Sequence, residues 1–66
     1  MQVQTLAEWL AKTGLTQRWV AEQLGIREAT VSAWIRGGRP SLAMAVKIQA
    51  LTGGQVPARI WVQEQR

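Results

Sequence analysis

The chain has 66 residues and a net charge of +4, because eight Lys and Arg residues outnumber four Glu residues. It contains no Cys, His or Asp, so it offers no disulfide, no thiolate or imidazole metal site and no nucleophile paired with a base. We therefore expect neither an enzyme nor a bound cofactor or metal. A chain this short buries only about 60% of its unfolded surface, and a partner subunit would add to its stability.

No apolar run approaches the roughly 20 residues that a membrane-spanning helix needs. The N-terminus also lacks the basic and then apolar layout of a signal peptide. We expect a cytoplasmic protein that has no membrane partner.

The first predicted helix begins after Thr5, which forms a capping box with Glu8. It runs from Leu6 to about Lys12, and Gly14 ends it. One face of this helix is predicted to pack on the rest of the chain through Leu6, Trp9, Leu10 and Thr13.

Residues 17–37 predict two helices joined by a tight turn. Thr16 caps the first of them, which runs roughly from Gln17 to Leu24. Gly25 can adopt the left-handed conformation that ends this helix, and the small Ala21 lets the next helix approach closely. Five apolar side chains are spaced to share one interior: Val20, Leu24, Ile26, Val31 and Trp34.

The next helix, about Glu28 to Ile35, is polar or small at its remaining positions. Such a surface is unusual for a helix enclosed in a core and suits one that lies in a groove. These positions are Arg27, Glu28, Ala29, Thr30, Ser32, Ala33 and Arg36.

In this segment the sequence resembles the Cro/cI-type, XRE-like helix-turn-helix proteins, which include phage repressors and their bacterial relatives. The matching residues are Gln17, Ala21, Gly25, Val31, Ser32, Trp34 and Gly37. The resemblance extends more loosely over residues 5–52. It implies an all-α fold, a small lambda-repressor-like bundle of four to five helices, and binding to double-stranded DNA.

The charge distribution agrees with a polyanionic partner. Five positive side chains and two negative ones lie in or just after the motif, so this region holds +3 of the net +4. They are Arg18, Arg27, Arg36, Arg39 and Lys47 on one side, and Glu22 and Glu28 on the other.

The candidates for base contacts are Arg27, Glu28, Ala29, Ser32 and Ala33. Arg27 can donate twice to guanine, although a phosphate contact is an equal alternative. Glu28 can accept from cytosine N4, but a glutamate in the first turn also simply favours the helix dipole. The two alanines can contact thymine methyl groups, and the resemblance places the serine toward the groove.

The candidates for phosphate contacts are Gln17, Arg18, Thr30, Arg36, Arg39 and Lys47. Amides at the start of a helix bind phosphate oxygens, which favours Gln17. In the resembled family the leading glutamine contacts a phosphate and braces a side chain near the start of the recognition helix. That side chain would be Glu28 here.

A fourth helix is predicted from Leu42 to Leu51, capped by Ser41 after the glycine and proline loop at residues 36–40. It is apolar nearly all round, with Leu42 and Val46 on one flank and Met44, Ile48 and Leu51 on another. One flank can pack on the motif while the other meets a further segment or subunit. Together with the resemblance, this predicts a homodimer.

The tail at residues 55–66 is ambiguous. Val56, Ile60, Trp61 and Val62 favour a strand that pairs across a dimer, but Pro57 can open a helical turn, and we prefer a short helix. Trp9 and Trp34 are expected in the core. Trp19 and Trp61 are candidate interface residues, although intramolecular packing is the preferred prediction for Trp19.

We therefore predict a single DNA-binding domain over residues 1–66, with the motif at about 17–37. The predicted function is that of a Cro-like repressor that binds an operator as a homodimer, with half-sites about one helical turn apart. No small-molecule effector is expected. The alternative is an antitoxin-type or other protein-interaction helix-turn-helix module.

Overall fold

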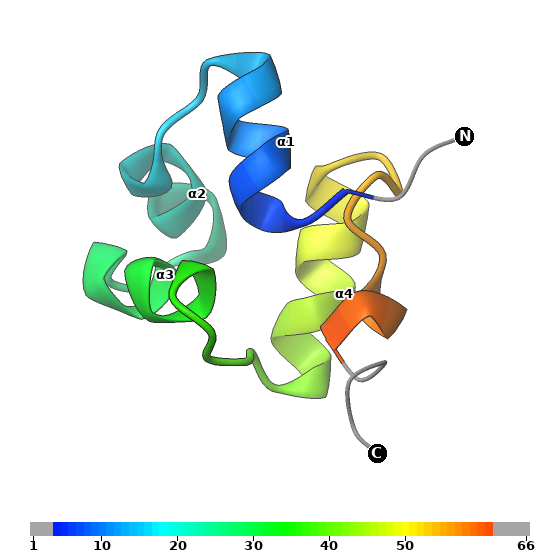
Figure 1. The fold of residues 1–66 in the computed structure, drawn as a ribbon. Helices are drawn as coiled ribbons and strands as arrows, with labels where there is room; N and C mark the ends of the chain where they lie inside the picture. The colour runs from blue at the N-terminus through cyan, green and yellow to red at the C-terminus, as the bar shows by residue number, and fades with distance from the viewer. Residues whose placement is uncertain (1–3, 62–66) are drawn as a thin grey trace.

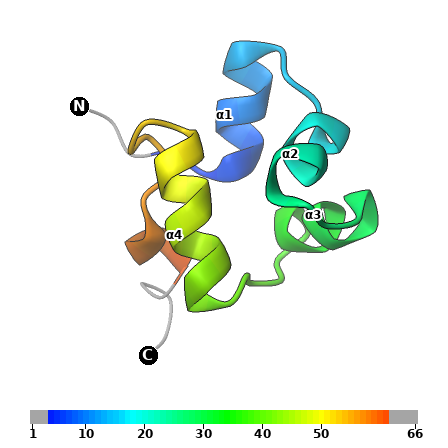
Figure 2. The ribbon, with the colours of Figure 1, turned by 180° about the vertical axis from the view of Figure 1, so that it is seen from behind.

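The computed structural model describes residues 4–61, and its regular elements within that range are all helical. Figure 1 shows α2 (Gln17–Leu24) and α3 (Glu28–Ile35) side by side, with α1 (Leu6–Thr13) above them. The longer helix α4 (Leu42–Leu51) lies across the molecule from the α2–α3 pair, and the short 3₁₀-helix η1 (Ala58–Trp61) packs against it. The view from behind in Figure 2 shows the same arrangement, with α3 at the periphery. The predicted all-α class is confirmed.

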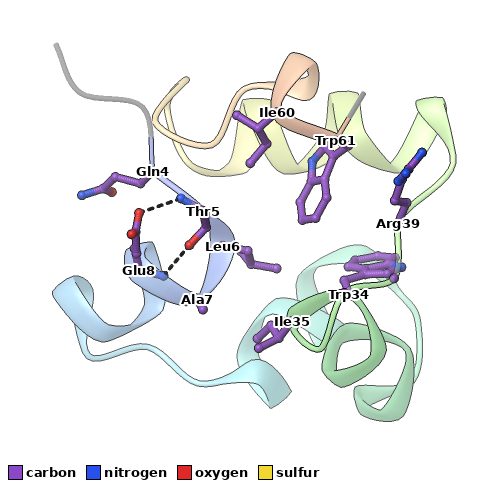
Figure 3. Close-up of a pocket in the computed structure, with 12 residues that line it drawn as sticks. Gln4, Thr5, Leu6, Ala7, Glu8, Trp34, Ile35, Arg39, Ile60 and Trp61 are labelled. Carbon is purple, nitrogen blue, oxygen red and sulfur yellow. Dashed lines mark hydrogen bonds between the residues drawn. The ribbon is translucent and has the colours of Figure 1, made fainter. Parts of the chain in front are cut away.

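The helix starts follow from hydroxyl caps. The Thr5 hydroxyl accepts from the Glu8 amide at 3.1 Å while the Glu8 carboxylate accepts from the Thr5 amide at 3.0 Å, which completes the predicted capping box (Figure 3). Thr16 and Ser41 cap α2 and α4 with a single bond each, accepted from the amides of Trp19 and Met44. Each cap satisfies an amide that has no partner inside its helix. The predicted starts of these three helices are therefore confirmed.

The core lies where α1, α2, α3 and α4 meet. Val20 and Val31 are fully buried, and Trp34 is 8% exposed, while Leu24 and Ile26 pack against this core with part of their surface exposed. The predicted convergence of the motif's apolar residues is thus confirmed. Further core residues come from the other elements: Leu6, Trp9, Leu10, Ile48 and Val56.

The prediction that Thr13 belongs to the packing face of α1 was wrong. The side chain of Thr13 is exposed, and its hydroxyl donates to the Trp9 carbonyl oxygen at 2.9 Å. A threonine near a helix end can bond back to the preceding turn in this way, so it needs no place in the core. The helix itself extends through Thr13, one residue beyond the predicted end at Lys12, and Gly14 caps it.

One flank of α4 packs on the rest of the chain as predicted, whereas contact of the other flank with a further segment or subunit stays a prediction. Ile48 is fully buried and Met44 and Leu51 are partly buried, whereas Leu42 is 72% exposed and Val46 is 50% exposed. Among the described residues these two are the large apolar side chains left in solvent.

The tail forms a helical turn up to Trp61. Thr52 is buried, and its hydroxyl donates to the Ile48 carbonyl and accepts from the Val56 amide. Pro57 then precedes η1, whose first amide, that of Ala58, donates to Gln49 Oε1 at 2.8 Å. Residues 56–61 contain no strand, so the preferred helical interpretation holds for them, while Val62 lies outside the described residues.

Candidate nucleic-acid interface

The turn between α2 and α3 is set by a left-handed glycine and a small residue. Gly25 has φ 70° and ψ 34°, and the Ile26 amide donates to the Ala21 carbonyl at 3.0 Å. Ala21 is 3% exposed, so no larger side chain separates the two helices at this point. Because the chain turns so tightly, α3 begins at Glu28 and packs directly on α2.

The exposed face of α3 carries four residues, which we call the α3 stripe: Ala29, Ser32, Ala33 and Arg36. Residues spaced by three and four lie on one helix face. Ala29, Ala33 and Arg36 are exposed and Ser32 is partly exposed, whereas Val31 and Trp34 hold the opposite side in the core. A helix face of small and polar side chains therefore projects from the molecule.

The amino end of α3 is open to solvent. Arg27 occupies the N-cap position but makes no side-chain capping bond, and both Arg27 and Glu28 are exposed. The side chain of Thr30 is exposed as well. The predicted base-contact residues thus lie together at the stripe or at its amino end.

Gln17 forms a hydrogen bond with a residue of the α3 stripe that the resemblance did not indicate. The Ser32 hydroxyl donates to Gln17 Oε1, a short contact that joins the first residue of α2 to the middle of α3 across 15 positions of sequence. The family pattern implied that Gln17 would brace Glu28. The structure pairs Gln17 with Ser32 instead, which lies one helical turn after Glu28 on α3 and within hydrogen-bond reach of the first residue of α2.

The predicted cationic residues lie on several elements. Arg36 lies on the stripe, Lys47 is exposed on α4, and Arg39 lines a pocket described below. Arg18 and Glu22 form an ion pair at 3.6 Å, with their side chains 77% and 63% exposed. Such an exposed pair contributes no more than about 1 kcal/mol, so the pair holds Arg18 only weakly.

The two remaining tryptophans differ in their surroundings. Trp19 is partly buried, and its ring lies 6.3 Å from that of Trp9, centroid to centroid. Trp61, in η1, packs against the core with part of its surface exposed, and its Nε1 atom is buried without a hydrogen-bond partner among residues 4–61. Both side chains therefore make contacts within the chain.

A pocket of about 380 Å³ lies away from the α3 stripe, and nothing in the sequence pattern predicted it. It lies between the start of α1, the carboxyl end of α3 and η1, with Trp34, Ile35 and Trp61 around it (Figure 3). Gln4 Oε1, at its edge, is another buried polar atom that lacks a partner in the described part of the chain.

Residues 4–61 hold no cluster of three or more acidic, His or Cys side chains that could bind a metal ion. No helix in the same range is long and apolar enough to cross a membrane.

Comparison with known families decides what kind of protein carries this geometry. A family model described as Helix-turn-helix matches residues 6–56, which is most of the chain. The chain belongs to the Cro/cI-type, XRE-like helix-turn-helix family. Searches among curated proteins and among solved structures give no significant match.

Membership in this helix-turn-helix family makes the protein a DNA-binding transcription regulator, and the family is one of regulators rather than of enzymes. The matched region includes all four α-helices and stops before η1. Within it, the α3 stripe is the exposed face of the second helix of the motif, the helix that such domains place in the major groove.

Proposed function

We propose that this regulator is a Cro-like repressor that binds an operator as a homodimer, with α3 in the major groove. The observation that carries the proposal is the α3 stripe. Its alanines are short enough to let the helix enter deeply, and exposed arginines stand at its two ends, Arg27 and Arg36. A duplex groove supplies both the depth and the negative charge that this surface suits.

Base readout is assigned to the amino end of α3 and the stripe. Arg27 can donate to N7 and O6 of guanine, and Glu28 can accept from N4 of cytosine. Ala29 and Ala33 can contact thymine methyl groups. The exposure of all four side chains supports this assignment.

Contacts with the phosphate backbone of the DNA are assigned to the residues around the stripe. Gln17 stands at the amino end of α2, where free amides and the helix dipole favour a phosphate. Thr30 and Arg36 flank the groove-facing side chains, and the exposed Arg18 can exchange its weak pair with Glu22 for a phosphate. Two more cations extend the contact to the loop after α3 and to α4, namely Arg39 and Lys47.

The homodimer is assigned to the outer flank of α4. Leu42 and Val46 lie one turn apart and are the large apolar side chains exposed in the described chain. Burial of such a pair against the same pair of a second copy removes apolar surface from water on both sides. A two-fold dimer of this kind requires an operator with two symmetric half-sites.

The decisive experiment is selection of binding sites from random duplexes, followed by titration of the recovered site. We expect a palindromic sequence with half-sites about one helical turn apart, bound by two copies of the chain. A recovered site without symmetry, bound by one copy, would contradict the homodimer. Failure to enrich any sequence would contradict sequence-specific repression.

The same α4 flank favours a second candidate, an antitoxin-type module that uses Leu42 and Val46 to bind a different protein. The two functions differ in what the purified chain does alone. A repressor that dimerises through this flank does so in the purified chain, whereas a module that uses the flank for a different protein does not self-associate through it. Sedimentation equilibrium of the chain, with and without the selected duplex, distinguishes them.

A further inference from the structure

The hydrogen bond between Ser32 and Gln17 restricts what Ser32 can recognise. A serine hydroxyl has one hydrogen to donate and two lone pairs that accept. Here the hydrogen goes to Gln17 Oε1. The Ser32 oxygen is therefore left as an acceptor, on a residue that keeps part of its surface exposed in the α3 stripe.

The two polar atoms of the Gln17 side chain have different surroundings. Its Oε1 atom receives the Ser32 hydroxyl, and its Nε2 amide has no protein partner among the described residues. That amide is not among the buried unpartnered atoms, so solvent reaches it. One side chain thus braces the reading helix and presents two donors at the amino end of α2.

We propose that Gln17 sets Ser32 as an acceptor, so that the base read by Ser32 must carry an exocyclic amino group. In the major groove these groups are N4 of cytosine and N6 of adenine, whereas guanine and thymine present acceptors at the corresponding positions. A serine whose hydroxyl rotates freely serves any base. The preference therefore depends on Gln17, which is a positioning residue for the base contact and a phosphate donor at once.

The neighbours of Ser32 support this selection. Ala29 and Ala33 have no polar side-chain atoms, so the Ser32 oxygen is the polar atom in the middle of the stripe. Glu28, four residues earlier on the same face, also offers only acceptors when ionised. The centre of the reading surface thus favours amino groups on the DNA.

This inference rests on the proposed function, since it requires α3 to lie in the major groove. The test uses the duplex selected by the full chain, with every base pair of one half-site replaced in turn. Three variants are compared with the wild type: Ser32→Ala, Gln17→Ala and Gln17→Glu. The Glu variant keeps an oxygen that accepts from Ser32 but loses the amide donors.

We expect Ser32→Ala to remove the preference at one base pair, where the wild type favours both adenine and cytosine over guanine and thymine on the same strand by about fivefold, as expected for one hydrogen bond. Gln17→Ala should remove the same preference and also weaken binding to every duplex. Gln17→Glu should weaken binding to every duplex while the preference survives. The double variant Gln17→Ala/Ser32→Ala should show no further loss of preference, since the two residues act as a unit.

A matched control is Gln23→Ala, which removes an exposed glutamine from the same helix outside the interface and should change neither affinity nor preference. Helical circular dichroism and a thermal midpoint confirm that each variant is folded. The inference is overturned if Gln17→Ala keeps the full preference, if Ser32→Ala changes none, or if adenine is grouped with thymine or with guanine, rather than with cytosine, at the base pair concerned. In those cases a symmetric selected site still supports the proposed function, whereas a wild type that selects no sequence contradicts that function.

Discussion

Trp9 of α1 and Trp19 of α2 lie with their ring centroids 6.3 Å apart and their planes tilted by 36°. This geometry falls in the range in which aromatic pairs attract one another beyond the burial of their surface. Trp9 is buried and Trp19 covers it from the outer side, with part of its own surface in solvent. The pair joins the packing helix to the first helix of the motif.

We predict that Trp19→Ala lowers the free energy of unfolding by about 2 kcal/mol. This is less than the roughly 3 to 5 kcal/mol typical of a fully buried aromatic side chain, because Trp19 is only partly buried. Urea denaturation followed by circular dichroism measures the change, and Trp19→Phe, which keeps an aromatic ring, should cost less. If Trp19→Ala leaves the unfolding free energy unchanged and only weakens self-association, Trp19 is an interface anchor instead.

The helix boundaries could be predicted from the sequence because they depend on local chemistry. Thr5, Thr16 and Ser41 each bond an amide three residues ahead, so the signal and its effect lie within one turn. The predicted bounds of α2, α3 and α4 coincide with those in the structure. The stop at Gly25 has the same local origin, since its left-handed backbone is set by the residue type.

The details of the candidate site depend on contacts between helices, which the spacing of residues does not contain. The partner of Gln17 is Ser32 and not Glu28, and the choice between them rests on how α3 crosses α2 and on the side-chain rotamers. The pocket beside Trp61 likewise forms where three separate segments meet. The spacing of residues thus predicted which side chains of α3 face outward, whereas the packing of α3 on α2 determined which of their atoms are hydrogen-bonded.

Substitution by asparagine should have different effects at Gly25 and Gly38, because Gly25 adopts a positive φ whereas Gly38 lies too close to a neighbouring backbone atom for a Cβ. Gly25 has φ 70°, and a Cβ there would meet nothing within 4 Å. At Gly38 a Cβ would lie 2.9 Å from the Ala33 carbonyl oxygen, a backbone atom that also accepts from the Gly38 amide. Asparagine tolerates the left-handed region but cannot avoid a steric clash.

We therefore predict that Gly25→Asn costs less than about 1 kcal/mol of unfolding free energy and that Gly38→Asn costs about 2 kcal/mol or more. Chemical denaturation of both variants checks the order. As a control, Gly25→Val should be worse than Gly25→Asn, since a β-branched residue strongly disfavours positive φ. Equal costs at the two positions would contradict this explanation.

Arg36 and Arg59 provide a matched pair for the electrostatic contribution to DNA binding. Both side chains are exposed and each removal lowers the net charge by one, but Arg36 lies on the α3 stripe and Arg59 in η1, which packs on α4. We predict that Arg36→Ala weakens binding about tenfold at low salt and lowers the slope of log affinity against log salt by about one. Arg59→Ala should change both quantities little.

Fluorescence anisotropy titrations of one duplex at several salt concentrations measure these slopes. Arg36→Ala should weaken binding to the selected duplex and to an unrelated duplex by similar factors, because phosphate contacts do not depend on sequence. Similar losses for Arg36→Ala and Arg59→Ala would show that net charge alone, rather than the placement of Arg36, controls binding.

Trp61 holds a buried Nε1 donor without a partner, and an unpartnered buried donor costs free energy. We predict that Trp61→Phe leaves the free energy of unfolding within about 1 kcal/mol of the wild-type value, because loss of the unpaired donor offsets loss of contact area. Trp61→Ala, which removes the same donor and most of the ring contacts, should destabilise clearly more. Thermal and urea unfolding of the two variants test this order. A Phe variant as unstable as the Ala variant would mean that the Nε1 group makes a stabilising bond.

Leu42 and Val46 should control assembly without affecting the fold. Because their side chains are 72% and 50% exposed, replacement of both by serine is expected to change the unfolding free energy of the monomer by no more than about 0.5 kcal/mol at each site. The same double variant should shift sedimentation equilibrium toward monomer and weaken binding to the palindromic site. Binding to an isolated half-site should be retained, since the α3 stripe is unchanged.

Lys47→Ser, on the same helix, is the control and should leave the monomer–dimer equilibrium unchanged. If the Leu42→Ser/Val46→Ser variant dimerises like the wild type, another surface forms the dimer, and the apolar flank of α4 is left as a site for a different protein.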